Sequence, residues 1–190
     1  HTKIKPIKNN TNKQNILKMK KYITILLMSA AGFAFADDEV YDGQTIYSMD
    51  FSNAKLNYSS WRNANINSSN NFTGASLREA DFTGTTISVN KFANANLKDS
   101  TFDKSTCYGA KFDGANLTNA SFLDAKLTYS SSSYGYATSF VGTNLTNAKL
   151  SGLTFSNSRY NVSFKNANLR NADLSDGVFS NGGNTSKCDF

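Results

Sequence analysis

Large apolar side chains recur at every fifth position through the middle of the chain, and the residue two places before each of them is usually small. An α-helix has a period of 3.6 residues and a strand a period of 2, so neither produces a spacing of five. A short fixed repeat predicts a stacked, quasi-one-dimensional architecture. Twelve of these positions, which we call centres, follow one another without a slip: Phe72, Leu77, Phe82, Ile87, Phe92, Leu97, Phe102, Cys107, Phe112, Leu117, Phe122 and Leu127.

The spacing continues on both sides of this run, with three irregular steps. A six-residue step separates Ile66 from Phe72, a thirteen-residue step follows Leu127, and a four-residue step follows Tyr160. Each step predicts a bulge, a register adjustment or a loop. The further centres are Ile46, Phe51, Leu56, Trp61 and Ile66 before the run, and Phe140, Leu145, Leu150, Phe155, Tyr160, Phe164, Leu169, Leu174 and Phe179 after it.

Glycine and asparagine dominate two places after the centre, as at Gly74 and Asn94. Both residue types tolerate the positive φ angles of tight turns. Each unit therefore predicts a short extended segment, an inward pair of one small and one large side chain, and a corner. Four corners close a square, so a coil is expected to take twenty residues. Phe72, Phe92 and Phe112 are then expected to lie above one another.

Several units share the form Ala-(Asp/Asn)-Leu or Ala-Asp-Phe. They are Ala80-Asp81-Phe82, Ala95-Asn96-Leu97, Ala115-Asn116-Leu117, Ala167-Asn168-Leu169 and Ala172-Asp173-Leu174. Over almost all of Thr45 to Ser180 the chain resembles the pentapeptide repeat family, whose units read A-(D/N)-L-x-x. The resemblance implies an all-β fold, a right-handed quadrilateral parallel β-helix. With coils spaced like β-strands, it implies about 6.5 coils at ~4.8 Å each.

The front of the chain is expected to lie outside this fold. Residues 19–36 combine Met19-Lys20-Lys21, an apolar stretch and the small-residue motif Ala34-Phe35-Ala36, which together predict a secretory signal peptide. The alternative is a buried or membrane-anchoring helix, although Ser29 and Gly32 interrupt the apolar stretch. Residues 1–18 are predicted to be a disordered upstream segment, and the alternative is upstream sequence that is not translated. The β-helix is then expected over 37–190, with a loop insertion at 128–139.

Export changes how the charge is interpreted. The whole chain has 20 Lys and Arg against 14 Asp and Glu, but seven of the lysines precede residue 37. The remaining domain carries 13 basic and 14 acidic residues, a net charge of −1. The basic character of the whole chain therefore does not predict nucleic-acid binding.

The two cysteines, Cys107 and Cys188, are not expected to form a disulfide. Cys107 occupies a centre and should point inward, and Cys188 falls about four coils away, or ~19 Å, which is too far for a disulfide. Cys107 is predicted to be a small buried apolar residue, and Cys188 a free thiol.

The long step after Leu127 contains Tyr129, Tyr134 and Tyr136 among serine and glycine. Exposed tyrosine with serine and glycine is typical of adaptable recognition loops, so these three residues are the candidate partner-binding site. The alternative is a tolerated insertion whose tyrosines fold against the coil.

The predicted domain contains few residues of the types that catalyse reactions. The only histidine is His1, outside the predicted domain, which excludes His-dependent nucleophilic catalysis and His metal sites there. Asp81, Asp103 and Asp173 occupy ordinary outward positions of the repeat. No glycine-rich phosphate loop is present. The sequence predicts no catalytic, cofactor or metal site.

The sequence thus favours an exported, non-enzymatic β-helical scaffold that binds another protein or macromolecule in the periplasm or outside the cell. End-to-end homodimerisation is a further hypothesis. The family resemblance implies an alternative, a DNA mimic that binds type II topoisomerases and protects gyrase. Such mimics are strongly acidic and cytoplasmic, so the net charge of −1 and the predicted signal peptide count against that role.

Overall fold

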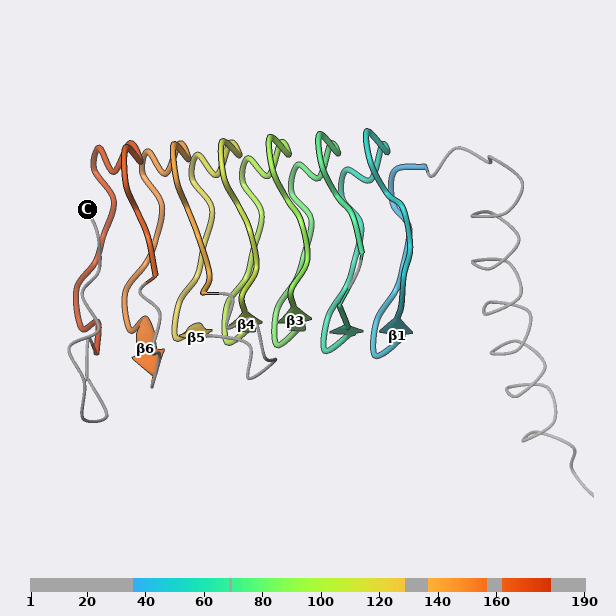
Figure 1. Cartoon of the computed structure of the whole chain (residues 1–190), viewed down its shortest axis with the longest axis horizontal. Helices are drawn as coiled ribbons and strands as arrows, with labels where there is room; N and C mark the ends of the chain where they lie inside the picture. Colours follow the sequence, from blue (N-terminus) through green and yellow to red (C-terminus); the bar gives the residue numbers. More distant parts are fainter. Residues whose placement is uncertain (1–35, 69, 129–136, 157–161, 179–190) are drawn as a thin grey trace, which may run out of the picture. The chain divides into compact units, whose positions relative to one another are not determined.

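The computed structural model describes residues 36–68, 70–128, 137–156 and 162–178. Its strands form one parallel sheet in which each strand is hydrogen-bonded to the next one along the chain (Figure 1). The chain therefore returns to the sheet in the same direction each time, as in a solenoid. These ranges contain no helix, and therefore none that would span a membrane. The strands are β1 (Thr45–Ile46), β2 (Asn65–Ile66), β3 (Thr86–Ser88), β4 (Thr106–Tyr108), β5 (Lys126–Thr128) and β6 (Thr154–Ser156).

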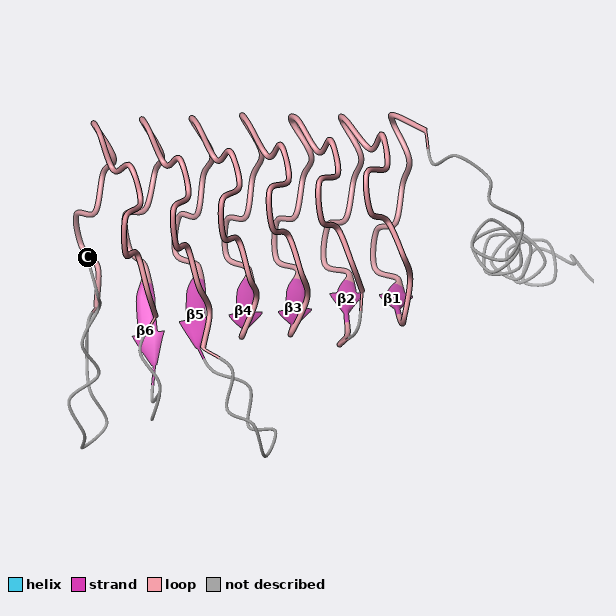
Figure 2. Ribbon diagram, turned by 45° about the horizontal axis from the view of Figure 1, so that its top comes forward, coloured by secondary structure: helices cyan, strands magenta, loops and turns pink. Residues whose placement is uncertain are grey.

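Three further walls are held together by isolated parallel bridges rather than by longer strands. We number the walls in chain order and call the wall made by β1 to β6 the sheet wall, which Figure 2 shows as a row of short strands along one side. The first wall carries Phe51, Phe72, Phe92, Phe112, Phe140 and Phe164; the second Leu56, Leu77, Leu97, Leu117, Leu145 and Leu169; the third Trp61, Phe82, Phe102, Phe122, Leu150 and Leu174. The described chain is thus an all-β parallel β-solenoid.

Aromatic rings twenty residues apart stack inside the solenoid. On the first wall the ring centroids of Phe72 and Phe92 are 4.7 Å apart, and those of Phe92 and Phe112 are 5.1 Å apart. On the third wall Phe82 and Phe102 stack at 4.7 Å. The two columns meet edge to face, with 88° between the planes of Phe92 and Phe102. The predicted stacking of side chains twenty apart is confirmed.

All twelve centres from Phe72 to Leu127 are buried, with 1% or less of each residue exposed. The small residues two places before them fill the remaining space, and most of the alanines there are buried as well. Strand β3 shows the pattern, because Ile87 points inward while Thr86 and Ser88 point outward. Burial of one such large side chain stabilises the fold by about 1.5–3 kcal/mol.

The irregular steps all fall at the corner between the sheet wall and the first wall. From one centre to the next this corner takes five residues between Ile87 and Phe92, but six, thirteen and nine in the three irregular coils. The stacking resumes undisturbed after each, since Phe140 lies 5.0 Å from Phe112 and 4.9 Å from Phe164. Added residues are therefore accommodated at one corner, where they do not shift the walls.

Phe155 lies on the sheet wall, in β6, and Phe164 lies on the first wall, so these two occupy successive walls. Tyr160 itself falls outside the described residues, as do Phe179 and Cys188.

The corners explain the preference for Gly and Asn. Among the described residues two places after a centre, all but Ser68 have a φ angle between +48° and +69°. Gly and Asn reach this conformation at little cost, but Val89 occupies it too, at +49°. A β-branched side chain at positive φ is strained.

We expect Phe102→Asp to unfold the solenoid, because the carboxylate would be buried without a partner between Phe82 and Phe122. A thermal melt followed by circular dichroism measures this. Thr101→Asp is the matched control, since it places the same carboxylate one residue away on the outer surface of the wall. A Phe102→Asp protein that melts like the unchanged chain would contradict the stacked core.

We expect Val89→Asn to stabilise the protein by about 1 kcal/mol, because asparagine accepts the positive φ of this corner more readily than valine. Urea titration gives the free energy of unfolding. The same exchange at Val141, which lacks a positive φ, is the control and should give no gain. Equal effects at the two positions would show that backbone strain at Val89 is not the cause.

Candidate interaction surface

The interior offers no accessible reactive group. Cys107 is fully buried, and burial raises the pKa of its thiol to about 12, so the thiol stays protonated and unreactive. Within the described ranges no three His, Cys, Asp or Glu side chains are grouped to hold a metal ion. Any recognition by the solenoid therefore uses the outward positions that flank each centre.

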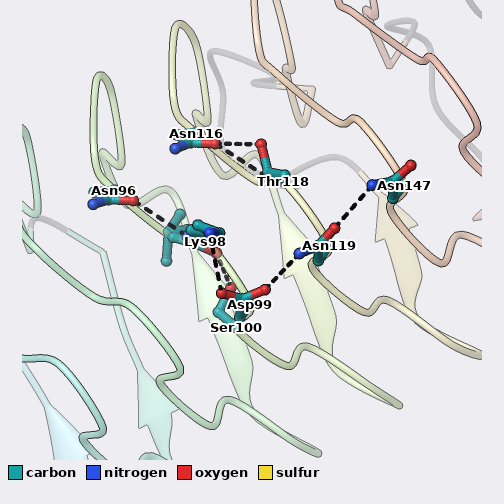
Figure 3. Close-up of polar contacts among 9 residues, drawn as sticks. Asn96, Lys98, Asp99, Ser100, Asn116, Thr118, Asn119 and Asn147 are labelled. Carbon is teal, nitrogen blue, oxygen red and sulfur yellow. Dashed lines mark hydrogen bonds and ion pairs between the residues drawn. The ribbon is translucent and has the colours of Figure 1, made fainter.

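The corner that ends the second wall carries a ladder of polar side chains (Figure 3). The amide nitrogen of Asn119 donates to a carboxylate oxygen of Asp99 at 2.7 Å. Asn147 donates to Asn119, and Asn171 to Asn147, each at 3.1 Å. These four side chains link successive coils to one another, so their polar atoms stabilise the stack.

A second set of polar contacts on this wall closes each corner locally. The side-chain oxygen of Asn116 accepts hydrogen bonds from the backbone N–H and the hydroxyl of Thr118, at 3.2 and 2.7 Å (Figure 3). Asn144 and Thr146 repeat the arrangement one coil further on. The recurring Asn of the motif thus forms an Asx-turn that supports the corner.

The acidic residues of the third wall have the same structural role. Asp81 accepts a hydrogen bond from the N–H of Thr83 at 2.9 Å and pairs with Arg62 at 3.2 Å. Asp103 binds the hydroxyl of Ser121 and the N–H of Leu123 in the next coil. Backbone and hydroxyl hydrogen bonds from Ser175 hold the pKa of the Asp173 carboxyl below its usual value. These carboxylates therefore accept hydrogen bonds that hold the corners of the solenoid.

Hydrogen bonds hold the two ends of the insertion after β5 against the solenoid. The ammonium group of Lys111 donates to the carbonyl of Ala137 at 2.7 Å. The hydroxyl of Thr138 lies 3.1 Å from the carbonyl oxygens of both Thr128 and Cys107. The two ends of the insertion therefore lie side by side. Burial lowers the pKa of Lys111, which is half-buried in this contact.

The predicted partner-binding residues Tyr129, Tyr134 and Tyr136 lie outside the described residues. The structure fixes only the corner from which their segment departs, between the sheet wall and the first wall. Their role stays a prediction.

Two buried asparagines at this corner were missed by sequence reasoning. Asn90 accepts a hydrogen bond from the backbone N–H of Asn70 at 3.1 Å and donates to the carbonyl of Ile66 at 2.8 Å. Asn70 in turn accepts from the N–H of Met49 at 2.8 Å. Side-chain amides thus replace backbone pairing where the corner varies in length. The twenty residues that separate Asn70 from Asn90 equal one coil, and this spacing was the signal in the sequence that could have revealed them.

The model of the family described as pentapeptide repeats matches residues 50–88, 90–119 and 107–131, in eight copies. Residues 50–131 thus carry the repeats of the pentapeptide repeat family, as the repeat pattern indicated. No curated protein matches the chain at a significant level.

Solved structures with the same kind of repeat resemble the chain at low identity. One is HetL from the cyanobacterium Nostoc sp. strain PCC 7120, involved in heterocyst differentiation regulation, at 20% identity over 81% of this chain and 90% of that one, with a TM-score of 0.33. Another is a protein of the Arabidopsis thaliana thylakoid lumen, at 27% identity over 60% and 69%, with a TM-score of 0.30. A third is trypsin-treated QnrB1, a plasmid-mediated fluoroquinolone resistance protein, at 16% identity over 76% and 90%, with a TM-score of 0.35.

We expect Lys111→Met to destabilise the protein by about 1 kcal/mol, because it removes the hydrogen bond to Ala137 while keeping a side chain of similar length. Urea titration measures the change. Lys91→Met, on the same wall one coil earlier and exposed, is the control and should be neutral. Equal losses for both would show that the insertion does not depend on Lys111.

Proposed function

We propose that this protein is an exported, non-enzymatic scaffold that binds another macromolecule through its outer walls. The observation that carries the proposal is the solid interior, in which the described centres from Ile46 to Phe164 are buried and the rings of the first and third walls stack. A packed column of this kind presents long, regular surfaces, but its interior has no room for a substrate. Rigid surfaces of stacked repeats are suited to binding extended partners.

The finer features of the architecture belong to the same proposal. We infer a right-handed, four-sided β-helix of about 6.5 coils, released from a signal peptide over residues 19–36 into the periplasm or the medium. The insertion at 128–139 supplies the tyrosines of a recognition loop, and the hydrogen bonds of Ala137 and Thr138 support this role because they hold the ends of the insertion at one corner.

Export is tested by expressing the full chain with a C-terminal tag in a bacterial host and fractionating the cells. We expect the protein outside the cytoplasm with Asp37 as its first residue, because Ala34 and Ala36 form the cleavage site. Ala36→Asp is the control and should leave the precursor uncleaved. Uncleaved cytoplasmic protein that also inhibits supercoiling by gyrase would instead establish the DNA-mimic alternative.

Binding is tested by using the purified chain as bait for the periplasm or culture supernatant of its source. A chain that lacks residues 130–136 is the matched bait. We expect it to melt at the same temperature and to retain less partner, since the deletion removes Tyr134 and Tyr136 but leaves the contacts of Lys111 and Thr138. Loss of the fold in this variant would show that the insertion is structural.

A further inference from the structure

The outer surface of the sheet wall differs from the other walls in charge. Among its described outward positions the one charged residue is Lys126, and there is no acid. The outward positions before its centres are Thr45, Asn65, Thr86, Thr106, Lys126, Thr154 and Val178; those after its centres include Tyr47, Asn67, Ser88 and Tyr108. The charges of the other walls are Asp50, Lys91, Lys111, Asp113 and Lys165 on the first, Lys55, Arg78, Lys98 and Arg170 on the second, and Asp42, Arg62, Asp81, Asp103, Lys149 and Asp173 on the third.

The sheet wall is also the one with regular strands. In β3 and β4 the residues on either side of the centre point outward together, so each of these strands adds a pair of polar side chains, Thr86 with Ser88 and Thr106 with Tyr108. Successive pairs are in register and are spaced by ~4.8 Å, the distance between hydrogen-bonded strands. The wall is therefore a flat grid of hydroxyl, amide and phenol groups.

These polar groups have free hydrogen-bonding capacity. The side chains of Thr86, Ser88, Thr106 and Tyr108 make no hydrogen bond to another described residue. Polar side chains on the second and third walls, by contrast, bind one another or the corner backbone, as Asn116 does. The sheet wall thus keeps donors and acceptors available to a ligand.

Two exposed tyrosines lie in one column of this wall. Tyr47 is 62% exposed and directly follows β1. Tyr108 is 37% exposed and is the last residue of β4. Each of them comes directly after the centre of its coil on this wall. Three coils separate them, which corresponds to ~14 Å along the solenoid. A tyrosine ring offers an apolar surface with a polar tip, and such rings pack against the C–H faces of sugar rings.

We propose that the sheet wall binds a neutral polysaccharide, laid along the solenoid axis across the strands. This inference rests on the proposed scaffold function and names its partner class. A polyanion such as a nucleic acid requires several cations, and the wall has one. A neutral polymer rich in hydroxyl groups matches a surface that has hydrogen-bonding groups and aromatic platforms but almost no charge.

The test is affinity gel electrophoresis of the full chain, as its host releases it, in gels that contain neutral mixed-linkage β-glucan or glucomannan, together with sedimentation on cellulose and chitin. We expect retention by at least one of these four neutral polymers and none by anionic polygalacturonate. The double change Tyr47→Ala and Tyr108→Ala should weaken retention at least tenfold. Tyr58→Ala is the matched control, because Tyr58 is 52% exposed on a different wall.

A second pair of variants guards against loss of folding. Thr106→Lys adds a charge to the sheet wall and should weaken retention at least threefold, whereas Thr101→Lys adds the same charge to the third wall and should not. Circular dichroism melts show whether each variant is folded. Absence of retention by all four neutral polymers, or equal losses for sheet-wall and control variants, overturns the assignment. A specific protein partner captured by the unchanged bait in that case preserves the scaffold function and rejects only the polysaccharide.

Discussion

The structure depends on one constraint: each coil must lie directly above the previous one in both its backbone and its inward side chains. Parallel backbone hydrogen bonds fix the spacing, and rings such as Phe92 and Phe112 stack at that spacing because they are twenty residues apart. The two requirements reinforce each other, since a slip of one residue would lose the bonds and expose the rings together. This is why extra residues are found at one corner and not within a wall.

That constraint also determines what the polar residues do. A coil turns four times within about twenty residues, so many backbone N–H groups lie at corners without a partner in regular structure. Asn116 and Asp81 supply acceptors for them, and Asn119 and Asn147 tie one corner to the next. Much of the amide and carboxylate content of the chain is therefore structural, and the abundance of Asp carries little evidence for acid–base chemistry.

The period of five was sufficient to predict the solenoid, the stacked columns and the corners, because it reports side-chain size and backbone conformation directly. The period of five was insufficient at positions where the size of the side chain does not decide the local structure. Phe155 and Phe164 occupy successive walls although nine residues separate them, and Val89 holds a corner conformation that its side chain disfavours. Asn70 and Asn90 are polar residues in a buried position, which a pattern of apolar centres does not register. The candidate tyrosines of the insertion belong to a segment whose arrangement the repeat does not specify.

The same periodicity lets the four walls differ chemically without affecting one another. Because residues twenty apart share a wall, a substitution changes one column and leaves the other three as they were. Charge could therefore be excluded from the sheet wall while the other walls retain theirs, at no cost to the common core. Charge on any of the walls keeps the protein soluble. The need for solubility therefore does not explain why the sheet wall has one lysine and two exposed tyrosines among its described residues. The side chains of Thr86, Ser88, Thr106 and Tyr108 make no hydrogen bond to another described residue, so a ligand rich in hydroxyl groups can replace the water that they bind, and such a ligand explains a wall that has almost no charge.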